Sequence, residues 1–418
     1  MGERGRFYGG SAAMNQDLVA ALIQSKEEKS MQVSKKLLVG SALSAMVALG
    51  GVCLNLPDSA KAMSDKPEAA ASMAGEKTYN ATFYVAGMGG HFAKAEAVIE
   101  PGAEQPIKVT RLTKIDIGDY ETHPTHDARI DNNDRNIMFY STYKIDHEAN
   151  GPHVGKIDLR TGKVIKDVVV DIPARATNTR SMYCASGQSK DSFIPLSMTS
   201  LAYIDVFNKS DLKRTQRVFL EGTEADTGPY KFYHGNTNHA MDRLLVIKND
   251  AETQHGKTSG KMDLVELDLN SLDQGKVKVL NKGTVAGTPD SISFRAYYSP
   301  DDSMIAASGA DVMFLIDAKT LEAIDVEPMG NLEQNHDAMF TPDGRYVIAT
   351  SRTKQAGLEC ENPEKPKEGE YTMDGQLKLY DVAARKFVGK PTSVCLACHE
   401  KEGVEEHAIL CGLDANFK

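Results

Sequence analysis

Ile316-Asp317-Ala318-Lys319-Thr320 is the clearest copy of the stretch that decides the fold. A β-forming run ends in Asp or Asn, a short turn containing Ser, Thr or Ala follows, and a second β-forming run begins. The same arrangement surrounds four other residues, which are Asp158, Asn208, Asp268 and Asp381. Successive markers are 49 to 64 residues apart, which is enough chain for one four-stranded sheet per repeat. We expect each Asx side chain to bond the backbone two residues on and to close the hairpin between the outer strands of its sheet.

A second repeat lies at the other end of the unit and leads into a Ser/Thr-Pro-Asp turn. Asn335-His336-Asp337-Ala338-Met339-Phe340-Thr341-Pro342-Asp343-Gly344-Arg345 matches Phe294-Arg295-Ala296-Tyr297-Tyr298-Ser299-Pro300-Asp301-Asp302, and looser copies begin at Thr125 and Glu406. This segment resembles the YVTN and cytochrome-d-type propeller families, in which an inner strand is followed by a turn of this kind. The resemblance implies a β-propeller fold, and it says far less about activity.

The two repeats together predict an all-β protein, a β-propeller of about seven four-stranded blades over residues 78–418. Five blades carry the Asx marker. An unmarked first blade is expected near Phe83 to Ile117, and a last blade is expected to be closed by the carboxy-terminal tail. Six or eight blades also fit the spacing.

The amino-terminal region has the pattern of an export signal. Basic Lys35-Lys36 is followed by an apolar stretch, Leu37 to Leu56, and by the small-residue cleavage site Ala60-Lys61-Ala62. We therefore expect residues 1–62 to be an N-terminal extension with a cleavable signal peptide and residues 63–77 to be a linker. The protein is then periplasmic or otherwise exported, with no stable membrane span after cleavage. An uncleaved apolar stretch would instead be a membrane anchor.

The charge balance argues against one class of partner. The chain has a formal net charge of −10 and a sequence pI of about 5.6, and it contains no basic block. A nucleic-acid surface needs clustered Lys and Arg to displace counterions from phosphates, so no nucleic-acid partner is expected. The sequence also lacks a G-x-S-x-G element, a phosphate-binding glycine loop, an H-E-x-x-H motif and a calcium loop. Common hydrolase and nucleotide chemistry therefore has no support, and we expect a function in redox chemistry or in binding.

The most specific chemical motif is Cys395-Leu396-Ala397-Cys398-His399. Two thiols three residues apart can add to both vinyl groups of one haem, and the adjacent histidine supplies an axial nitrogen to iron. We therefore expect one covalent haem c, attached through Cys395 and Cys398, with His399 as the proximal iron ligand. A redox-active C-x-x-C pair and half of a zinc site are the alternatives, and the second lacks another C-x-x-C to complete it.

The tail around this motif is too short to form a cytochrome domain of its own. Only nineteen residues follow His399, and little of the preceding sequence has a helical pattern. The haem is therefore expected to pack against the propeller. The sixth iron ligand is open between His407, a methionine and a histidine of the propeller face. The pairing of three further cysteines also stays open, and these are Cys184, Cys360 and Cys411.

Histidines give the second chemical signal. Several precede an expected inner strand, and in a propeller such strand starts converge around one opening of the central channel. Neutral imidazoles gathered there suit iron, copper or a second haem, whereas the structural alternative is that each bonds the neighbouring blade. The candidate ligands are His91, His126, His239, His336 and His407.

The remaining histidines divide into two groups. His123 lies just before a Pro-Thr pair and His234 precedes a Gly-Asn pair, so both are expected in loops that reach the same opening. His147, His153 and His255 fall in charged or glycine-containing stretches and are expected at the surface.

Arginines of the inner repeat also come near this opening. Arg129, Arg295 and Arg345 are placed either to hold an anion with the planar guanidinium or to pair with an aspartate of the repeat. We expect the second role, with Asp127 or Asp337 as the partner.

Two functions fit these signals. The first is a periplasmic c-type haem protein that passes electrons to a periplasmic redox partner protein, with the propeller as rigid support. The second is an oxidoreductase with a second haem or copper held by the channel histidines, as the resemblance to the propeller of haem-c-and-d nitrite reductases, or to copper-containing propeller enzymes, implies. Those reductases carry haem c on a separate amino-terminal domain, whereas here the motif is carboxy-terminal. A propeller used for protein binding alone would leave the C-x-x-C-H motif without a role.

Overall fold

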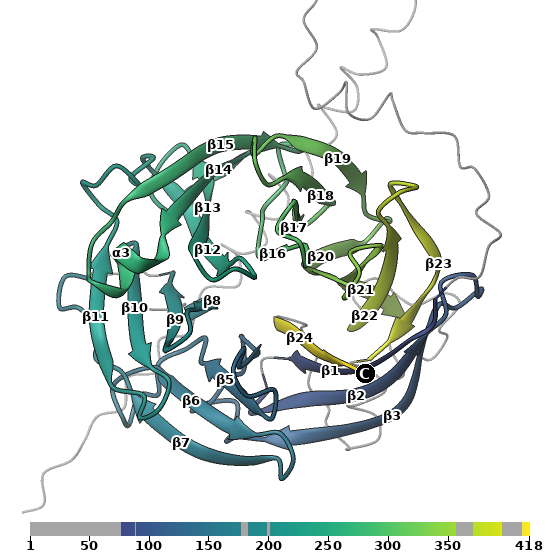
Figure 1. Ribbon diagram of the computed structural model, residues 1–418, viewed down its shortest axis with the longest axis horizontal. Coiled ribbons are helices and arrows are strands. Elements are labelled where there is room, and N and C mark those ends of the chain that lie inside the picture. The colour runs from purple at the N-terminus through teal and green to yellow at the C-terminus, as the bar shows by residue number, and fades with distance from the viewer. Residues whose placement is uncertain (1–76, 88, 177–182, 199–200, 357–370, 395–411) are drawn as a thin grey trace, which may run out of the picture. The chain divides into compact units, whose positions relative to one another are not determined.

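The chain folds into six four-stranded antiparallel sheets that form the blades of a ring (Figure 1). The structure is a computed structural model that describes residues 77–87, 89–176, 183–198, 201–356, 371–394 and 412–418. The expected signal peptide and the Cys395–His399 motif lie outside the described residues. The chain divides into residues 1–55 and 56–418, and every described residue belongs to the second unit. Neighbouring sheets contact one another around the ring, and the sixth contacts the first.

Each blade runs from an inner strand at the channel to an outer strand at the rim. Blade 1 consists of β24 (Gly412–Phe417), β1 (Tyr79–Ala86), β2 (His91–Ile99) and β3 (Ile107–Asp116). Blade 2 consists of β4 (Arg129–Ile130), β5 (Ile137–Ser141), β6 (His153–Asp158) and β7 (Lys163–Val169). Blade 3 consists of β8 (Tyr183–Gln188), β9 (Ser192–Ser197), β10 (Tyr203–Asn208) and β11 (Arg214–Phe219).

The second half of the ring repeats this order. Blade 4 consists of β12 (Tyr230–Thr237), β13 (Arg243–Ala251), β14 (Thr258–Asp268) and β15 (Val279–Ala286), with the short helix α3 (Leu269–Asp273) after β14. Blade 5 consists of β16 (Ala296–Tyr298), β17 (Met304–Ser308), β18 (Val312–Asp317) and β19 (Ala323–Pro328). Blade 6 consists of β20 (Glu333–Phe340), β21 (Tyr346–Ala356), β22 (Tyr371–Asp381) and β23 (Lys386–Ser393).

The ring has six blades, so the expected number of about seven is wrong. The repeat spacing predicts a separate last blade closed by the tail, but the tail strand β24 pairs with β1 from Ala81↔Phe417 to Ala86↔Gly412. The first blade has three consecutive strands, and the last strand of the chain supplies its inner one. A single strand of six residues cannot form a stable sheet by itself. It therefore adds to the open edge of an existing sheet.

The core consists of six apolar clusters, and each lies between two neighbouring blades. Alternate residues of one strand point to opposite sheet faces. In β13, Leu244 and Val246 join the cluster with blade 3, while Leu245 and Ile247 join the cluster with blade 5. Because both faces of a blade are covered, such strands read as continuous apolar runs in the sequence.

The Asx markers act as expected. Oδ1 of Asp158, Asn208, Asp268 and Asp317 accepts a hydrogen bond from the backbone N–H two residues on, at distances of 2.8 to 3.0 Å. Asp381 accepts from the N–H three residues on, at 2.9 Å. Four of the five markers close the hairpin between the two outer strands of a blade, and Asp268 caps α3 instead. The local prediction is therefore confirmed in full at Asp158, Asn208 and Asp317, and in part at Asp268 and Asp381.

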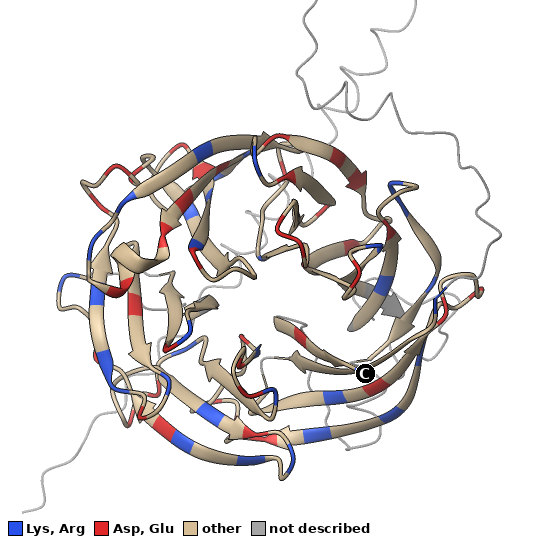
Figure 2. Cartoon of the chain, in the orientation of Figure 1, with Lys and Arg blue, Asp and Glu red and all other residues tan. Residues whose placement is uncertain are grey.

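Charged residues of both signs are interspersed along the outer strands and in the turns (Figure 2). The outer strands are the least buried strands of their blades, as β7 shows with no fully buried residue. Among the described residues, no helix has the length and apolar character that crossing a membrane requires.

Candidate cofactor face at the channel mouth

The inner strands all begin at one end of the channel, which we call the mouth and define by His126, Arg295 and His336. His126 lies three residues before β4, Arg295 directly precedes β16, and His336 lies within β20. The imidazoles of His126 and His336 meet edge to face, with ring centroids 5.9 Å apart. Two of the five candidate histidines are therefore brought together as the repeat predicts.

The other candidate histidines are not part of this pair. His91 begins β2, whose hairpin with β1 lies at the mouth end, but β2 is the third strand outward from the channel. His239 follows the end of β12, so it lies at the opposite end of the channel, where Asp302 bonds it at 3.3 Å. It stands beside a cavity of about 430 Å³ at the ends of the inner strands. His407 and His399 lie outside the described residues.

An ion pair crosses the channel axis at the mouth. Nη1 of Arg295, from blade 5, donates to Oδ1 of Asp127, from blade 2, and its Nη2 donates to the carbonyl oxygen of His126. Asp127 also accepts from Ser186 of blade 3 and lies 3.5 Å from Nη2 of Arg129. Blades 2 and 5 are opposite one another in a six-bladed ring, so this pair joins the two sides. The expected pairing of Arg129 and Arg295 with an aspartate of the repeat is confirmed.

Arg345 has a different position from the other two arginines. It is exposed in the turn after β20, and its guanidinium lies over the ring of Tyr346 at 5.7 Å from the centroid. That turn is at the opposite end of the inner strand from His336. Arg345 therefore takes no part in the mouth.

Asp337 carries a proton more readily than an ordinary aspartate. Burial is the main cause and raises the pKa of its carboxyl to about 6. The hydroxyl of Tyr297 lies 2.8 Å from Oδ1 of Asp337 and 2.6 Å from the carbonyl oxygen of Leu413. A tyrosine has one proton to donate. The Tyr297 hydroxyl therefore shares its one proton between two acceptors, the Asp337 carboxyl and the Leu413 carbonyl.

His126 is held as a neutral imidazole with a defined tautomer. Burial lowers its pKa well below the usual value, and the charge of Arg295 adds to the effect. Nδ1 lies 3.1 Å from the carbonyl oxygen of Tyr183. A carbonyl only accepts, so Nδ1 carries the proton and Nε2 keeps the lone pair.

Aromatic rings form a continuous ledge around this histidine. Phe232 stacks on Phe294 at 5.4 Å between centroids, and Phe294 stacks on His336 at 4.7 Å with the ring planes 13° apart. His336 meets His126, which in turn lies 4.4 Å from the ring of Tyr143. We call these five residues the aromatic ledge. It presents ring faces and edges from blades 2, 4, 5 and 6 at one end of the channel.

His234 is buried within β12 and gives the pH dependence of stability a predictable component. Its Nε2 bonds the hydroxyl of Ser293 at 2.9 Å, while Nδ1 has no partner among the described residues. Burial, with help from the charge of Arg295, lowers its pKa from 6.5 to about 3. Between these values the unfolded chain binds a proton that the folded chain does not, so this histidine makes the free energy of unfolding fall as the pH drops.

Replacing His234 with Gln is expected to reduce this acid sensitivity. Between pH 6 and pH 4 the slope of the unfolding free energy against pH should become shallower by about 1.4 kcal/mol per pH unit. The raised pKa of Asp337 makes the free energy of unfolding rise as the pH drops, in the wild type and in the variant alike. Urea unfolding of the variant is therefore compared with that of the wild type at each pH. Exposed His147→Gln is the control and should leave the slope unchanged. An unaltered slope in His234→Gln would show that this histidine is protonated in the folded state.

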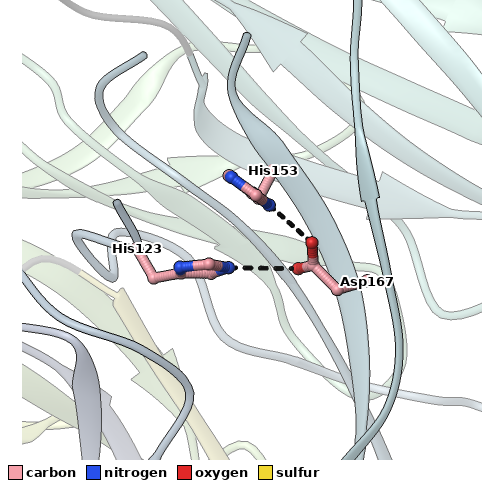
Figure 3. A group of neighbouring side chains, drawn as sticks. All are labelled: His123, His153 and Asp167. Carbon is pink, nitrogen blue, oxygen red and sulfur yellow. Dashed lines mark hydrogen bonds and ion pairs between the residues drawn. The ribbon is translucent and has the colours of Figure 1, made fainter. Parts of the chain in front are cut away.

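One group of converging side chains was not predicted. His153 is buried at the start of β6, contrary to the surface position expected for it, and bonds Asp167 of β7 (Figure 3). His123, in the connection between β3 and β4, lies 3.5 Å from the same carboxylate. The alternation of His153, Gly155 and Ile157 on one strand face is the signal that marks His153 as inward-pointing.

Comparisons with known proteins identify no family for this chain. No model of a known protein family matches the chain, and no curated protein matches it. Among solved structures, hydrazine synthase of Kuenenia stuttgartiensis is 14% identical with a TM-score of 0.43, over 64% of this chain and 65% of that one. TolB of Acinetobacter baumannii is 13% identical with a TM-score of 0.44, over 76% and 66%.

A protein of unknown function from Bacteroides caccae is 12% identical with a TM-score of 0.45, over 80% of this chain and 98% of that one. The chain thus spans just under two thirds of the hydrazine synthase and TolB chains that it matches. All three TM-scores are below 0.5, so the six-bladed architecture rests on the strand pairing of this chain itself.

Proposed function

We propose that this chain is an exported, periplasmic c-type haem protein of β-propeller fold that exchanges electrons with a partner protein. Cys395 and Cys398 would hold the haem, and His399 would be its proximal ligand. The bound haem supplies one-electron redox chemistry. The observation that carries the proposal is where the chain continues after the motif. A Cβ on Gly412 would lie 2.8 Å from the carbonyl oxygen of His126, so the chain runs directly beside the mouth.

The aromatic ledge has the chemistry that a planar macrocycle requires. Phe232 and Phe294 are half-buried and stacked, so they offer an apolar surface against which a flat ring system can pack. The guanidinium of Arg352 lies 5.6 Å from the centroid of Phe294, at the edge of this surface. A guanidinium in that position is suited to the carboxylates of the haem propionates.

His126 is the mouth histidine best prepared to ligate iron. Its pKa keeps it neutral, and its Nδ1–H donates to a backbone carbonyl, which leaves the Nε2 lone pair for a metal. Metal-ligating histidines in proteins are oriented by the same kind of bond from the second ring nitrogen. We therefore favour His126 over His336 as the sixth ligand.

The alternative function, an oxidoreductase with a second haem or copper held by His126, His239, His336 and His407, has less support. His239 lies at the opposite end of the channel from His126 and His336. A four-histidine centre would therefore lack one of its members. Electron transfer through one haem requires only the motif and the mouth.

The proposal is tested on the full chain matured in a host that has a cytochrome c assembly system. The pyridine haemochrome spectrum and metal analysis are expected to show one covalent haem per chain, reduced and reoxidised reversibly. Cys395→Ala with Cys398→Ala should carry none, because both thioether bonds are lost, whereas Cys184→Ala should keep the full amount. Wild-type protein without covalent haem would overturn the proposal.

The role of His126 as the sixth ligand is tested separately from haem attachment, in protein prepared in the same way. His126→Ala is expected to keep the covalent haem, since its attachment depends on the cysteines, but to change the absorption bands and raise the share of high-spin iron. An unchanged spectrum would mean that another residue is the sixth ligand, while the haem assignment would stand.

A further inference from the structure

Two imidazoles and one carboxylate converge in blade 2, apart from the mouth. His123 comes from the β3–β4 connection, His153 from β6 and Asp167 from β7, and their side chains point toward one another (Figure 3). Nδ1 of His153 lies 2.5 Å from Oδ1 of Asp167, and Nε2 of His123 lies 3.5 Å from Oδ2. One nitrogen or oxygen from each residue lies within 4.8 Å of the other two. Ligand atoms that bind one cation at about 2.0 to 2.2 Å lie no more than about 4.4 Å apart, so small rotations of these side chains would complete the site.

Each of the same three side chains is anchored by a further bond. Nε2 of His153 lies 3.2 Å from Oδ2 of Asp146, and Nδ1 of His123 lies 2.8 Å from the hydroxyl oxygen of Thr122. The hydroxyl of Tyr140 donates to Oδ2 of Asp167 at 2.5 Å. Metal-binding histidines and carboxylates are typically oriented by bonds of this kind, including the carboxylate–histidine arrangement of zinc sites. The inward atoms are thus held toward a common point.

Close packing also fixes the two flanks of this group. A Cβ on Gly118 would collide with the imidazole of His123, and a Cβ on Gly155 would collide with the ring of Tyr140. Glycine at both positions lets the rings approach. The side chain of His153 is 7% exposed, that of His123 is 16% exposed and that of Asp167 is 25% exposed, so one side faces solvent. Three protein ligands and an open side are typical of metal sites that keep a position for water or another ligand.

His153 lies between two carboxylates. One ring nitrogen bonds Asp167 and the other bonds Asp146. Burial disfavours the charged form of His153, but these two bonds outweigh that cost and raise its pKa.

We propose that His123, His153 and Asp167 form a binding site for a divalent transition metal. Imidazole nitrogen combined with one carboxylate oxygen is the ligand set used for Zn²⁺, Fe²⁺ and related ions, whereas Ca²⁺ and Mg²⁺ prefer oxygen alone. Nε2 of His123, Nδ1 of His153 and a carboxylate oxygen of Asp167 are the ligands. Asp146 orients His153, and Thr122 orients His123. This site shares no ligand with the haem proposed at the mouth.

The test is Zn²⁺ binding to the full chain after treatment with a chelator, followed by titration calorimetry and by metal analysis of the gel-filtered protein. One equivalent is expected for the wild type, and Zn²⁺ should raise the midpoint of thermal unfolding because it binds only the folded site. His123→Gln and Asp167→Asn should each lose this equivalent. Asp146→Asn should retain it with an affinity lower by about 10- to 100-fold, because it removes an orienting partner and no ligand.

Two controls keep the outcome unambiguous. His255→Gln replaces a histidine elsewhere in the ring and should bind Zn²⁺ as the wild type does. The chain with Cys395→Ala and Cys398→Ala, which cannot attach haem, should bind Zn²⁺ equally well, so failure of the haem proposal does not imitate failure of this one. If the wild type bound no Zn²⁺, or if His123→Gln and Asp167→Asn bound it with unchanged affinity, the assignment would be overturned.

Discussion

Deletion of residues 412–418 is expected to abolish the cooperative unfolding transition of the propeller. These residues form β24, whose six register pairs with β1 supply the inner strand of blade 1. Leu413 and Ala415 are fully buried in the apolar cluster between blades 1 and 6. The deletion removes those side chains and leaves the backbone of β1 as an exposed edge, which favours aggregation. Circular dichroism during heating and size-exclusion chromatography measure the loss.

The deletion has a matched control and a rescue. Removal of Lys418 alone takes away an exposed residue beyond β24 and should leave the transition in place. Addition of a peptide with the sequence of residues 412–418 should restore part of the transition, because an added strand can pair with an open sheet edge. A truncated chain that unfolds at the wild-type midpoint would show that the ring does not depend on β24.

Arg295→Leu is expected to destabilise the fold by about 3 to 5 kcal/mol, because it leaves Asp127 buried without its main charge partner. The side chains of Arg295 and Asp127 are 1% and 0% exposed. After the substitution Asp127 keeps Ser186 and a 3.5 Å approach to Arg129, which offset only part of the desolvation. Urea unfolding at neutral pH measures the difference. Doubly substituted Arg295→Leu with Asp127→Leu should recover part of the loss, since Asp127 is then no longer left as a buried carboxylate without Arg295.

Arg160→Leu is the matched control for this prediction. Arg160 pairs with Asp158 at 2.7 Å, but its side chain is 66% exposed, so water replaces the pair when it is lost. The midpoint of unfolding should stay close to that of the wild type. Equal effects of Arg160→Leu and Arg295→Leu would contradict the view that the pair across the channel stabilises the ring.

Local features of this fold are predictable from sequence, because they depend on residues next to one another. The turn at Asp317 needs only an acceptor side chain and a free N–H two residues later. Both lie within one short stretch of chain. The strand runs around Tyr346 and Leu244 are predictable for the same reason, since a short continuous apolar run of this kind indicates a buried strand without its partners.

Long-range features of this fold cannot be predicted from the sequence alone, because they depend on which distant segments meet. The strand Gly412–Phe417 is visible as a β-run, but nothing within it shows that its partner is β1. His239 could have been placed correctly, since the β-run Tyr230–Thr237 precedes it and puts it at the far end of an inner strand. The meeting of His123 with Asp167 depends on how β3 leads into blade 2, and single-sequence periodicity carries no signal for it.

The closure of the ring by β24 also sets an order of assembly. A ribosome delivers the chain from its amino end, so β1 is made among the first strands and waits for nearly the whole chain before its inner neighbour exists. Pairing of Ala81 with Phe417 has a very large separation along the sequence, which makes closure a slow, late kinetic step. Residues 395–411 are synthesised immediately before the closing strand. Any chemistry on Cys395 and Cys398 therefore falls in the same last stage of biogenesis as the completion of blade 1.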